Sequence, residues 1–121
     1  MIEMGIGKTD FTYKDPWGSE HGLALVRTTY QMTGNLAVEA LVADRNDEEY
    51  GQTWCSVTVN LGSLPDDDLA FLDTNNMGCE LVAMLDALGV YEYTGIMSRS
   101  GYCEYPLVRF AQEALEEMGR R

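Results

Sequence analysis

Hydrophobic and polar residues alternate regularly between Gln52 and Leu61, which predicts a β-strand near the middle of the chain. Side chains of an extended strand point alternately to its two faces. The apolar residues of this stretch would therefore share one face and lie against a core. They are Cys55, Val57, Val59 and Leu61.

Two earlier stretches also have the composition of strands. Gly22–Gln31 is rich in β-branched and aromatic residues, and Leu36–Ala43 carries an apolar residue at every second position. Thr33–Asn35 contains the glycine of a turn, and the polar segment Asp44–Gly51 leads on to the central strand. Residues 22–61 therefore predict a three-stranded antiparallel meander.

The segment after the central strand predicts a turn, a short strand and a helix. Gly, Pro and Asp between Gly62 and Asp68 favour a chain reversal, and Leu69–Leu72 is a short apolar run that fits a buried strand. Asp73–Asn76 offers side-chain oxygens that can cap the N–H groups of a following helix. Apolar positions then recur at helical spacing, and Gly89 would end the helix. These positions are Met77, Leu81, Met84, Leu85 and Leu88.

The remaining segments complete the pattern of an α+β protein. Phe11–Tyr13 predicts a short first strand, Tyr91–Tyr105 predicts a tyrosine-rich hairpin that turns at residues 98–101, and Leu107–Met118 predicts a second amphipathic helix. We therefore expect a single α+β domain over residues 1–121. It would have a mainly antiparallel sheet of about five to six strands, with two amphipathic helices packed on one face.

The charge of the chain is strongly negative. Twenty Asp and Glu residues against eight Lys and Arg residues give a formal net charge of −12. Direct binding to nucleic acid or to an anionic membrane needs a basic surface, so the composition disfavours both. It favours a basic protein partner instead.

The lack of a recognisable targeting signal and the spacing of the cysteines predict a reducing compartment. No apolar run approaches the roughly 20 residues that cross a bilayer, and the first residues lack the basic region and apolar core of a signal peptide. We therefore expect a cytoplasmic protein. Three widely spaced cysteines without a Cys-x-x-Cys pair fit reduced, buried thiols better than disulfides or a zinc site. They are Cys55, Cys79 and Cys103.

Two segments carry a resemblance to a protein family. VTVNLGSLPDDDLAFLDTNN (Val57–Asn76) and SGYCEYPLVRF (Ser100–Phe110) resemble a family of short uncharacterised proteins carried on bacterial plasmids, phages and conjugative elements. The resemblance implies no assigned activity. It does imply a genomic context, because mobile elements carry accessory proteins that disarm host defences.

Candidate catalytic and ligand-binding motifs are incomplete. Gly7–Thr9 lacks the upstream glycine of a phosphate-binding loop, and Asp73–Gly78 resembles the start of a calcium loop whose position 12 would be Met84. His21 is the only histidine, so a Cys-His nucleophile would need a cysteine to lie beside it. The carboxylates of Asp66–Asp73 could bind a divalent metal, but no second acidic pair or basic clamp is near in sequence. We expect no enzymatic activity, no cofactor and no metal site.

Most of the acidic residues without an obvious local cation form two clusters, and Arg45 offsets only part of the first. The first acidic cluster comprises Asp44, Asp47, Glu48 and Glu49, and the second comprises Asp66, Asp67, Asp68 and Asp73. Duplex DNA presents about one negative charge per 1.7 Å of its axis, so a rigid protein with rows of carboxylates can occupy the basic groove of a DNA-handling protein. The first hypothesis is therefore a non-enzymatic DNA mimic. It would block the nucleic-acid-binding surface of a host defence complex, as an anti-CRISPR or anti-restriction protein, and it requires the two clusters to form one continuous surface.

The alternative hypothesis is a protein-interaction module of a mobile element that binds a partner through the predicted hairpin. Tyr91, Tyr93 and Tyr102 would provide the contact surface, because tyrosine combines an apolar ring with a polar hydroxyl and is common in protein interfaces. In that case the acidic surface would serve solubility.

Overall fold

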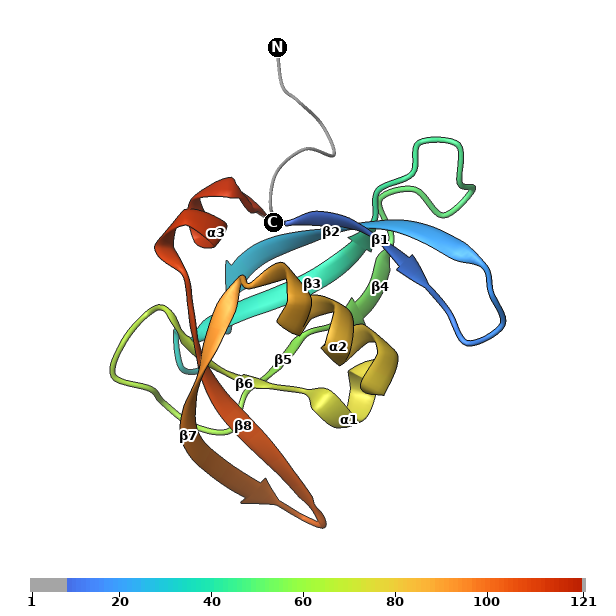
Figure 1. Ribbon diagram of the computed structural model, residues 1–121. Helices are drawn as coiled ribbons and strands as arrows, with labels where there is room; N and C mark the ends of the chain where they lie inside the picture. Colours follow the sequence, from blue (N-terminus) through green and yellow to red (C-terminus); the bar gives the residue numbers. More distant parts are fainter. Residues whose placement is uncertain (1–8, 121) are drawn as a thin grey trace.

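The computed structural model describes residues 9–120, which form nine strands and three helices organised in two sheets (Figure 1). The first sheet has the antiparallel order β1-β2-β3-β4, and β9 pairs in parallel with the C-terminal half of β2. Its strands are β1 (Asp10–Lys14), β2 (Glu20–Thr29), β3 (Leu36–Val42), β4 (Thr53–Ser56) and β9 (Gly119–Arg120). The predicted meander and the short first strand are confirmed.

The second sheet is antiparallel throughout, in the order β5-β6-β8-β7. Its strands are β5 (Thr58–Val59), β6 (Leu69–Leu72), β7 (Tyr91–Ser100) and β8 (Cys103–Phe110). The short strand after the acidic turn and the tyrosine-rich hairpin are therefore confirmed. The hairpin turns at residues 101–102 and not at residues 98–101 as predicted, because Ser98, Arg99 and Ser100 still pair with β8. The architecture is mainly antiparallel as expected, but it has more strands than the predicted sheet because the chain is divided between two sheets.

The predicted strand Gln52–Leu61 is not continuous. β4 pairs with β3, whereas β5 pairs with β6, so the chain passes from the first sheet to the second at Val57. The Val57 side chain is fully buried, and its N–H donates to the carbonyl of Val38 at 2.9 Å. Thr58, expected on the polar face, is buried too, because its Oγ1 accepts a hydrogen bond from the Val38 N–H at 3.0 Å. The crossover is thus fixed by hydrogen bonds that β3 provides.

The helix predicted after the second strand forms in two pieces, α1 (Thr74–Met77) and α2 (Cys79–Leu88). They are separated by Gly78, whose φ of +82° is not helical. Asp73 caps α1 as predicted, since its Oδ1 accepts a hydrogen bond from the N–H of Asn76 at 3.3 Å. Gly89 ends α2 in the left-handed conformation, with a φ of +71°. None of the described helices is long and apolar enough to cross a lipid bilayer.

The second predicted helix is wrong in its first half. Residues 107–110 belong to β8, and α3 covers only Gln112–Glu117. Leu107 and Phe110 have helical spacing, but Leu107 lies in a cluster on the outer face of the sheet whereas Val108 and Phe110 lie in the main core. That alternation is the pattern of a strand. Pairing with both β6 and β7 therefore overrides the local periodicity.

Both sheets and the helices contribute to one main hydrophobic core. Its members that are at most 1% exposed include residues of β2, β3, β6, α2, β8 and α3. They include Leu25, Val38, Leu72, Leu85 and Phe110. This shared core fixes the position of the second sheet and of the hairpin that extends from it.

The outer face of the second sheet carries a smaller cluster of three buried residues, which partly buried residues of segment 59–64 cover. The buried side chain of Asn35 holds this segment in place from the β2–β3 turn. Its Nδ2 donates to the carbonyl of Gly62 at 2.6 Å, and its Oδ1 accepts from the N–H of Leu64 at 2.9 Å. The three buried residues are Leu69, Phe71 and Leu107.

Candidate interaction surfaces

The first acidic cluster lies in the loop between β3 and β4. Asp44 and Asp47 each use Oδ1 to accept a hydrogen bond, at 2.9 Å, from the backbone N–H two residues further on. These bonds shape the loop. Arg45 lies over the ring of Tyr50, 5.6 Å from its centroid. The four acidic residues therefore lie in one loop, in which a single guanidinium offsets only part of their charge.

The second acidic cluster contains a cation that the sequence did not reveal. Arg109 on β8 binds Asp68 at 2.6 Å and Asp66 at 3.1 Å. These hydrogen bonds, the one to Asp68 first, raise the pKa of Arg109. Asp66 and Asp68 lack a cation near them in the sequence, but the structure pairs both with Arg109. The pairing could not be predicted locally, because Arg109 lies 43 and 41 residues from them along the chain. The antiparallel pairing of Leu69 with Arg109 brings them together.

The other two members of the second acidic cluster have different surroundings. Asp67 lines a cavity that Arg27 also lines. Asp73 caps α1. The second cluster is therefore not a single row of free carboxylates.

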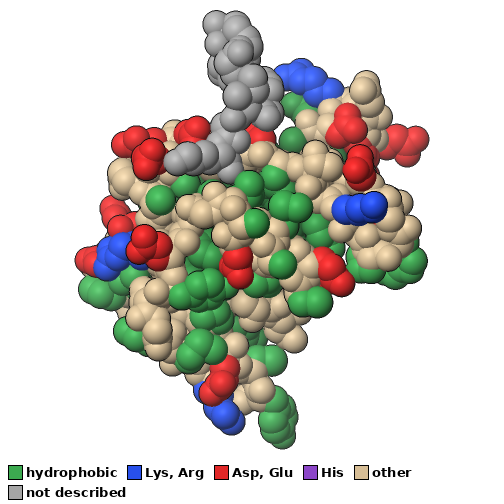
Figure 2. Space-filling view, viewed as in Figure 1, with side chains coloured by type: hydrophobic (Ala, Val, Ile, Leu, Met, Phe, Trp, Pro, Cys, Tyr) green, Lys and Arg blue, Asp and Glu red, His purple; other side chains and the backbone are tan. Residues whose placement is uncertain are grey.

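The two acidic clusters do not lie together. The loop between β3 and β4 is at the upper right of Figure 1, whereas the loop between β5 and β6 is at the left, beyond β2 and β3. Figure 2 shows the corresponding acidic side chains as separate groups, with hydrophobic and neutral surface between them. The continuous anionic surface that the DNA-mimic hypothesis required is not formed.

The three candidate tyrosines have three different environments. Tyr91 is 7% exposed, packs on Phe110 and donates a hydrogen bond to Oδ1 of Asp86 at 2.7 Å. Tyr93 is 49% exposed and donates to the same oxygen, also at 2.7 Å. Burial and then the bond to Asp86 raise the pKa of both tyrosines. Tyr91 is therefore a core residue, and its predicted place on a partner-binding surface is wrong.

Tyr102 occupies the tip of a hairpin that extends beyond the sheet. β6 pairs with β8 only from Leu107 to Arg109, so residues 96–106 form a two-stranded ribbon without a third strand. This ribbon projects downward in Figure 1. Gly101 has a φ of +64°, which suits the first central position of a type II′ turn. Tyr102 follows it with its side chain fully exposed.

Two further exposed residues of the hairpin, Ile96 and Met97, were missed in the sequence. They are 56% and 52% exposed and follow a bulge in β7. At this bulge Gly95 has a φ of +90°, and the Thr94 hydroxyl donates to the carbonyl of Leu107 at 2.9 Å. A glycine inside a strand pattern is the usual sequence signal of a bulge, and Gly95 was that signal.

His21 and the cysteines have the following surroundings. His21 Nε2 lies 2.9 Å from Oδ2 of Asp15, and its ring packs 4.5 Å from that of Trp54. The bond to His21 lowers the pKa of Asp15. Burial raises the pKa of Cys55 to about 11, whereas Cys79 is exposed, so the prediction of a buried thiol is wrong for Cys79. The part of the chain that the structure describes contains no group of three His, Cys, Asp or Glu side chains that could hold a metal ion.

The fold defines a small α+β protein with two antiparallel sheets and an extended hairpin. The chain belongs to the family described as Domain of unknown function (DUF4313), whose model matches residues 24–121. The matched residues include the hairpin and both acidic clusters. No curated protein and no solved structure matches the chain significantly.

Proposed function

We propose that this protein is an interaction module that binds a partner protein through the β7–β8 hairpin. The observation that carries the proposal is the exposed apolar surface of the ribbon. Ile96, Met97 and Tyr102 are 56%, 52% and 103% exposed on one projecting element. Large apolar side chains that gather on one exposed element are typical of protein interfaces, where tyrosine and methionine are enriched.

The geometry of the hairpin favours recognition through side chains. β7 is an edge strand, and an edge strand can accept a strand from a partner. The bulge between Tyr93 and Met97 interrupts its ladder, and a bulge disfavours such pairing. We therefore propose that the hairpin inserts Tyr102 at its tip, with Ile96 and Met97 further along the ribbon, into a groove of the partner.

The charge of the chain indicates what surrounds that groove. A net charge of −12 attracts a basic surface and accelerates the encounter with it, and salt weakens this effect. The proposed partner is therefore a protein with an apolar groove inside a basic surface. On this proposal the chain is an accessory protein of a bacterial mobile element that meets its partner in the host cytoplasm.

Affinity capture from host lysate, followed by mass spectrometry, would identify the partner for a binding titration. The double variant Met97→Ala/Tyr102→Ala should bind it at least about 30-fold more weakly, the loss of one interface hot spot. The matched control is Met32→Ala/Trp17→Ala, because these side chains are 93% and 88% exposed in other turns. Equal losses for the two double variants, or unchanged binding by the hairpin variant, would contradict the proposal.

A second candidate function is the DNA mimic that blocks a nucleic-acid-binding surface of a host defence complex. The first acidic cluster supports it, since its carboxylates gather in one exposed loop of a protein with a net charge of −12. Because the two clusters lie apart, this loop would have to act alone. The variant with Asp44, Asp47, Glu48 and Glu49 changed to Asn or Gln separates the two candidates. Loss of competition with DNA for the partner in this variant, with Tyr102→Ala unaffected, would favour mimicry over the hairpin.

A further inference from the structure

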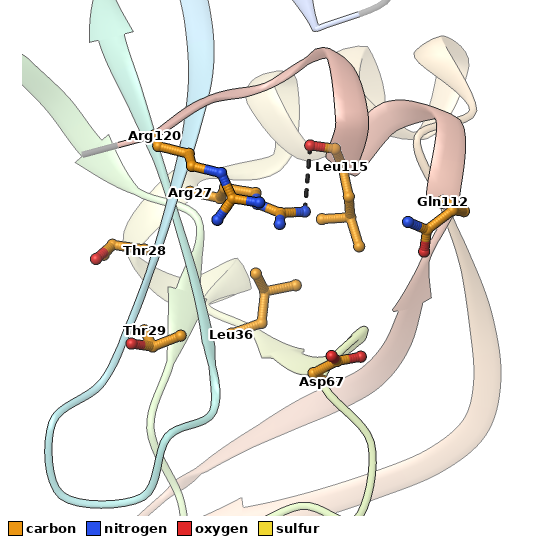
Figure 3. A pocket seen from close by; sticks show the side chains of 8 residues that line it. All are labelled: Arg27, Thr28, Thr29, Leu36, Asp67, Gln112, Leu115 and Arg120. Atoms are coloured by element: carbon orange, nitrogen blue, oxygen red, sulfur yellow. Dashed lines mark hydrogen bonds between the residues drawn. The ribbon is translucent and has the colours of Figure 1, made fainter.

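A cavity of about 370 Å³ lies between β2, α3 and the loop that precedes β6 (Figure 3). None of its lining residues belongs to the hairpin. Its lining combines two leucines with guanidinium, amide, hydroxyl and carboxylate groups. Its lining residues include Arg27, Leu36, Asp67, Gln112, Leu115 and Arg120.

Two arginines lie side by side at this cavity. Arg27 and Arg120 are direct partners in the parallel pairing of β2 with β9, and Figure 3 shows both side chains reaching toward the same space. Arg27 is half-buried, and its Nη1 donates to the carbonyl of Leu115 at 3.2 Å. That bond fixes one guanidinium at the cavity wall, while Arg120 is exposed at its rim.

This pairing places two positive charges opposite each other in a chain with 20 acidic residues. Like charges that face each other across strands are destabilising. Within residues 9–120, neither Arg27 nor Arg120 has a carboxylate at ion-pair distance, whereas Arg109 binds two aspartates. An anion between the two guanidinium groups would remove their repulsion and provide charge-assisted hydrogen bonds.

We propose that this cavity is a binding site for a small oxyanion, either a phosphate or a carboxylate group of a small molecule. Arg27 and Arg120 would hold the anionic group between their guanidinium groups. Leu36 and Leu115 provide an apolar wall for a short carbon chain. The cavity volume lies at the lower end of the range for small-molecule sites.

Titration calorimetry of the full chain with inorganic phosphate and, separately, with butyrate tests the proposal and distinguishes the two oxyanion sources. We expect saturable binding of at least one of them, with a dissociation constant on the order of 1 mM for one anion held by two guanidinium groups. Arg120→Gln should weaken it by about 10-fold or more. Asp67→Asn should strengthen it, because it removes a negative charge from the far side of the cavity.

The matched control is Arg99→Gln, which changes the net charge equally at the exposed Arg99–Glu104 pair of the hairpin. The Arg120 side chain makes no hydrogen bond within the described residues, so its variant should fold normally, which circular dichroism would verify. Backbone amide shifts on titration should change at residues 27–29 and 112–115. The proposal is overturned if neither anion binds saturably, if Arg99→Gln weakens binding as much as Arg120→Gln, or if the shifts change elsewhere instead.

Discussion

Replacement of Asn35 by alanine should remove the polar contacts that hold segment 59–64 over the second sheet. Asn35 is 5% exposed and makes three side-chain hydrogen bonds to this segment. Its Nδ2 donates to Oδ1 of Asn60 at 3.0 Å and to the carbonyl of Gly62 at 2.6 Å, and its Oδ1 accepts from the N–H of Leu64 at 2.9 Å. Alanine at this position can make none of these bonds.

The expected loss of stability follows from these contacts. One neutral hydrogen bond contributes about 1 kcal/mol net, so the three bonds together contribute about 3 kcal/mol. A domain of this size has a free energy of unfolding of about 5–15 kcal/mol. Asn35→Ala should therefore remove a large fraction of the stability and lower the urea midpoint without changing the topology.

Urea unfolding followed by circular dichroism and tryptophan fluorescence would measure this loss. The matched control is Asn75→Ala, an exposed position of α1 whose side chain makes no hydrogen bond within the described residues. It should change the free energy of unfolding by less than about 0.5 kcal/mol. A loss below about 1 kcal/mol for Asn35→Ala would refute the conclusion that Asn35 fixes the segment.

Three further predictions concern titration, thiol reactivity and backbone conformation. The folded protein holds the phenol proton of Tyr91 to a higher pH than the unfolded chain, whose tyrosines titrate near 10.0. The contribution of Tyr91 to the free energy of unfolding should therefore be fully present below pH 10.0 and fall above it by up to about 1.4 kcal/mol per pH unit. Urea unfolding of Tyr91→Phe should show a shallower fall. Cys55, with its pKa raised to about 11 from 9.0, should react with a disulfide reagent at pH 8 about 100-fold more slowly in the folded protein than in urea, where burial no longer raises its pKa. Gly89→Ala should lower the unfolding free energy by about 1 kcal/mol, because alanine is strained at a φ of +71°. An unchanged urea midpoint would contradict that reason.

The sequence predicts those elements whose pattern is local. The alternation in β3, the apolar run of β6, the Asp73 cap and the Gly89 terminus are all confirmed. The crossover at Val57 was missed because apolar and polar residues continue to alternate through it in the sequence. Only the strands with which the chain pairs change there. The helix predicted for residues 107–110 is wrong for the same reason. These residues form the end of β8 because they pair with β6 and β7, which lie far from them in sequence.

The candidate site was less predictable because it depends on contacts distant in sequence. Three tyrosines look equivalent in the chain, yet Tyr91 is buried, Tyr93 is bound to Asp86 and Tyr102 is exposed. The pairing of Arg109 with two aspartates likewise follows from strand register. A bulge signal at Gly95 was present in the sequence, and it would have indicated the exposed residues that follow it.

Hydrogen–deuterium exchange of the chain, alone and bound to its captured partner, tests the central claim most directly. Residues 96–103 should gain the largest protection on binding, because the hairpin tip enters the partner. Protection confined to residues 44–49, with exchange in the hairpin unchanged, would contradict the proposed role of the hairpin and favour an acidic contact.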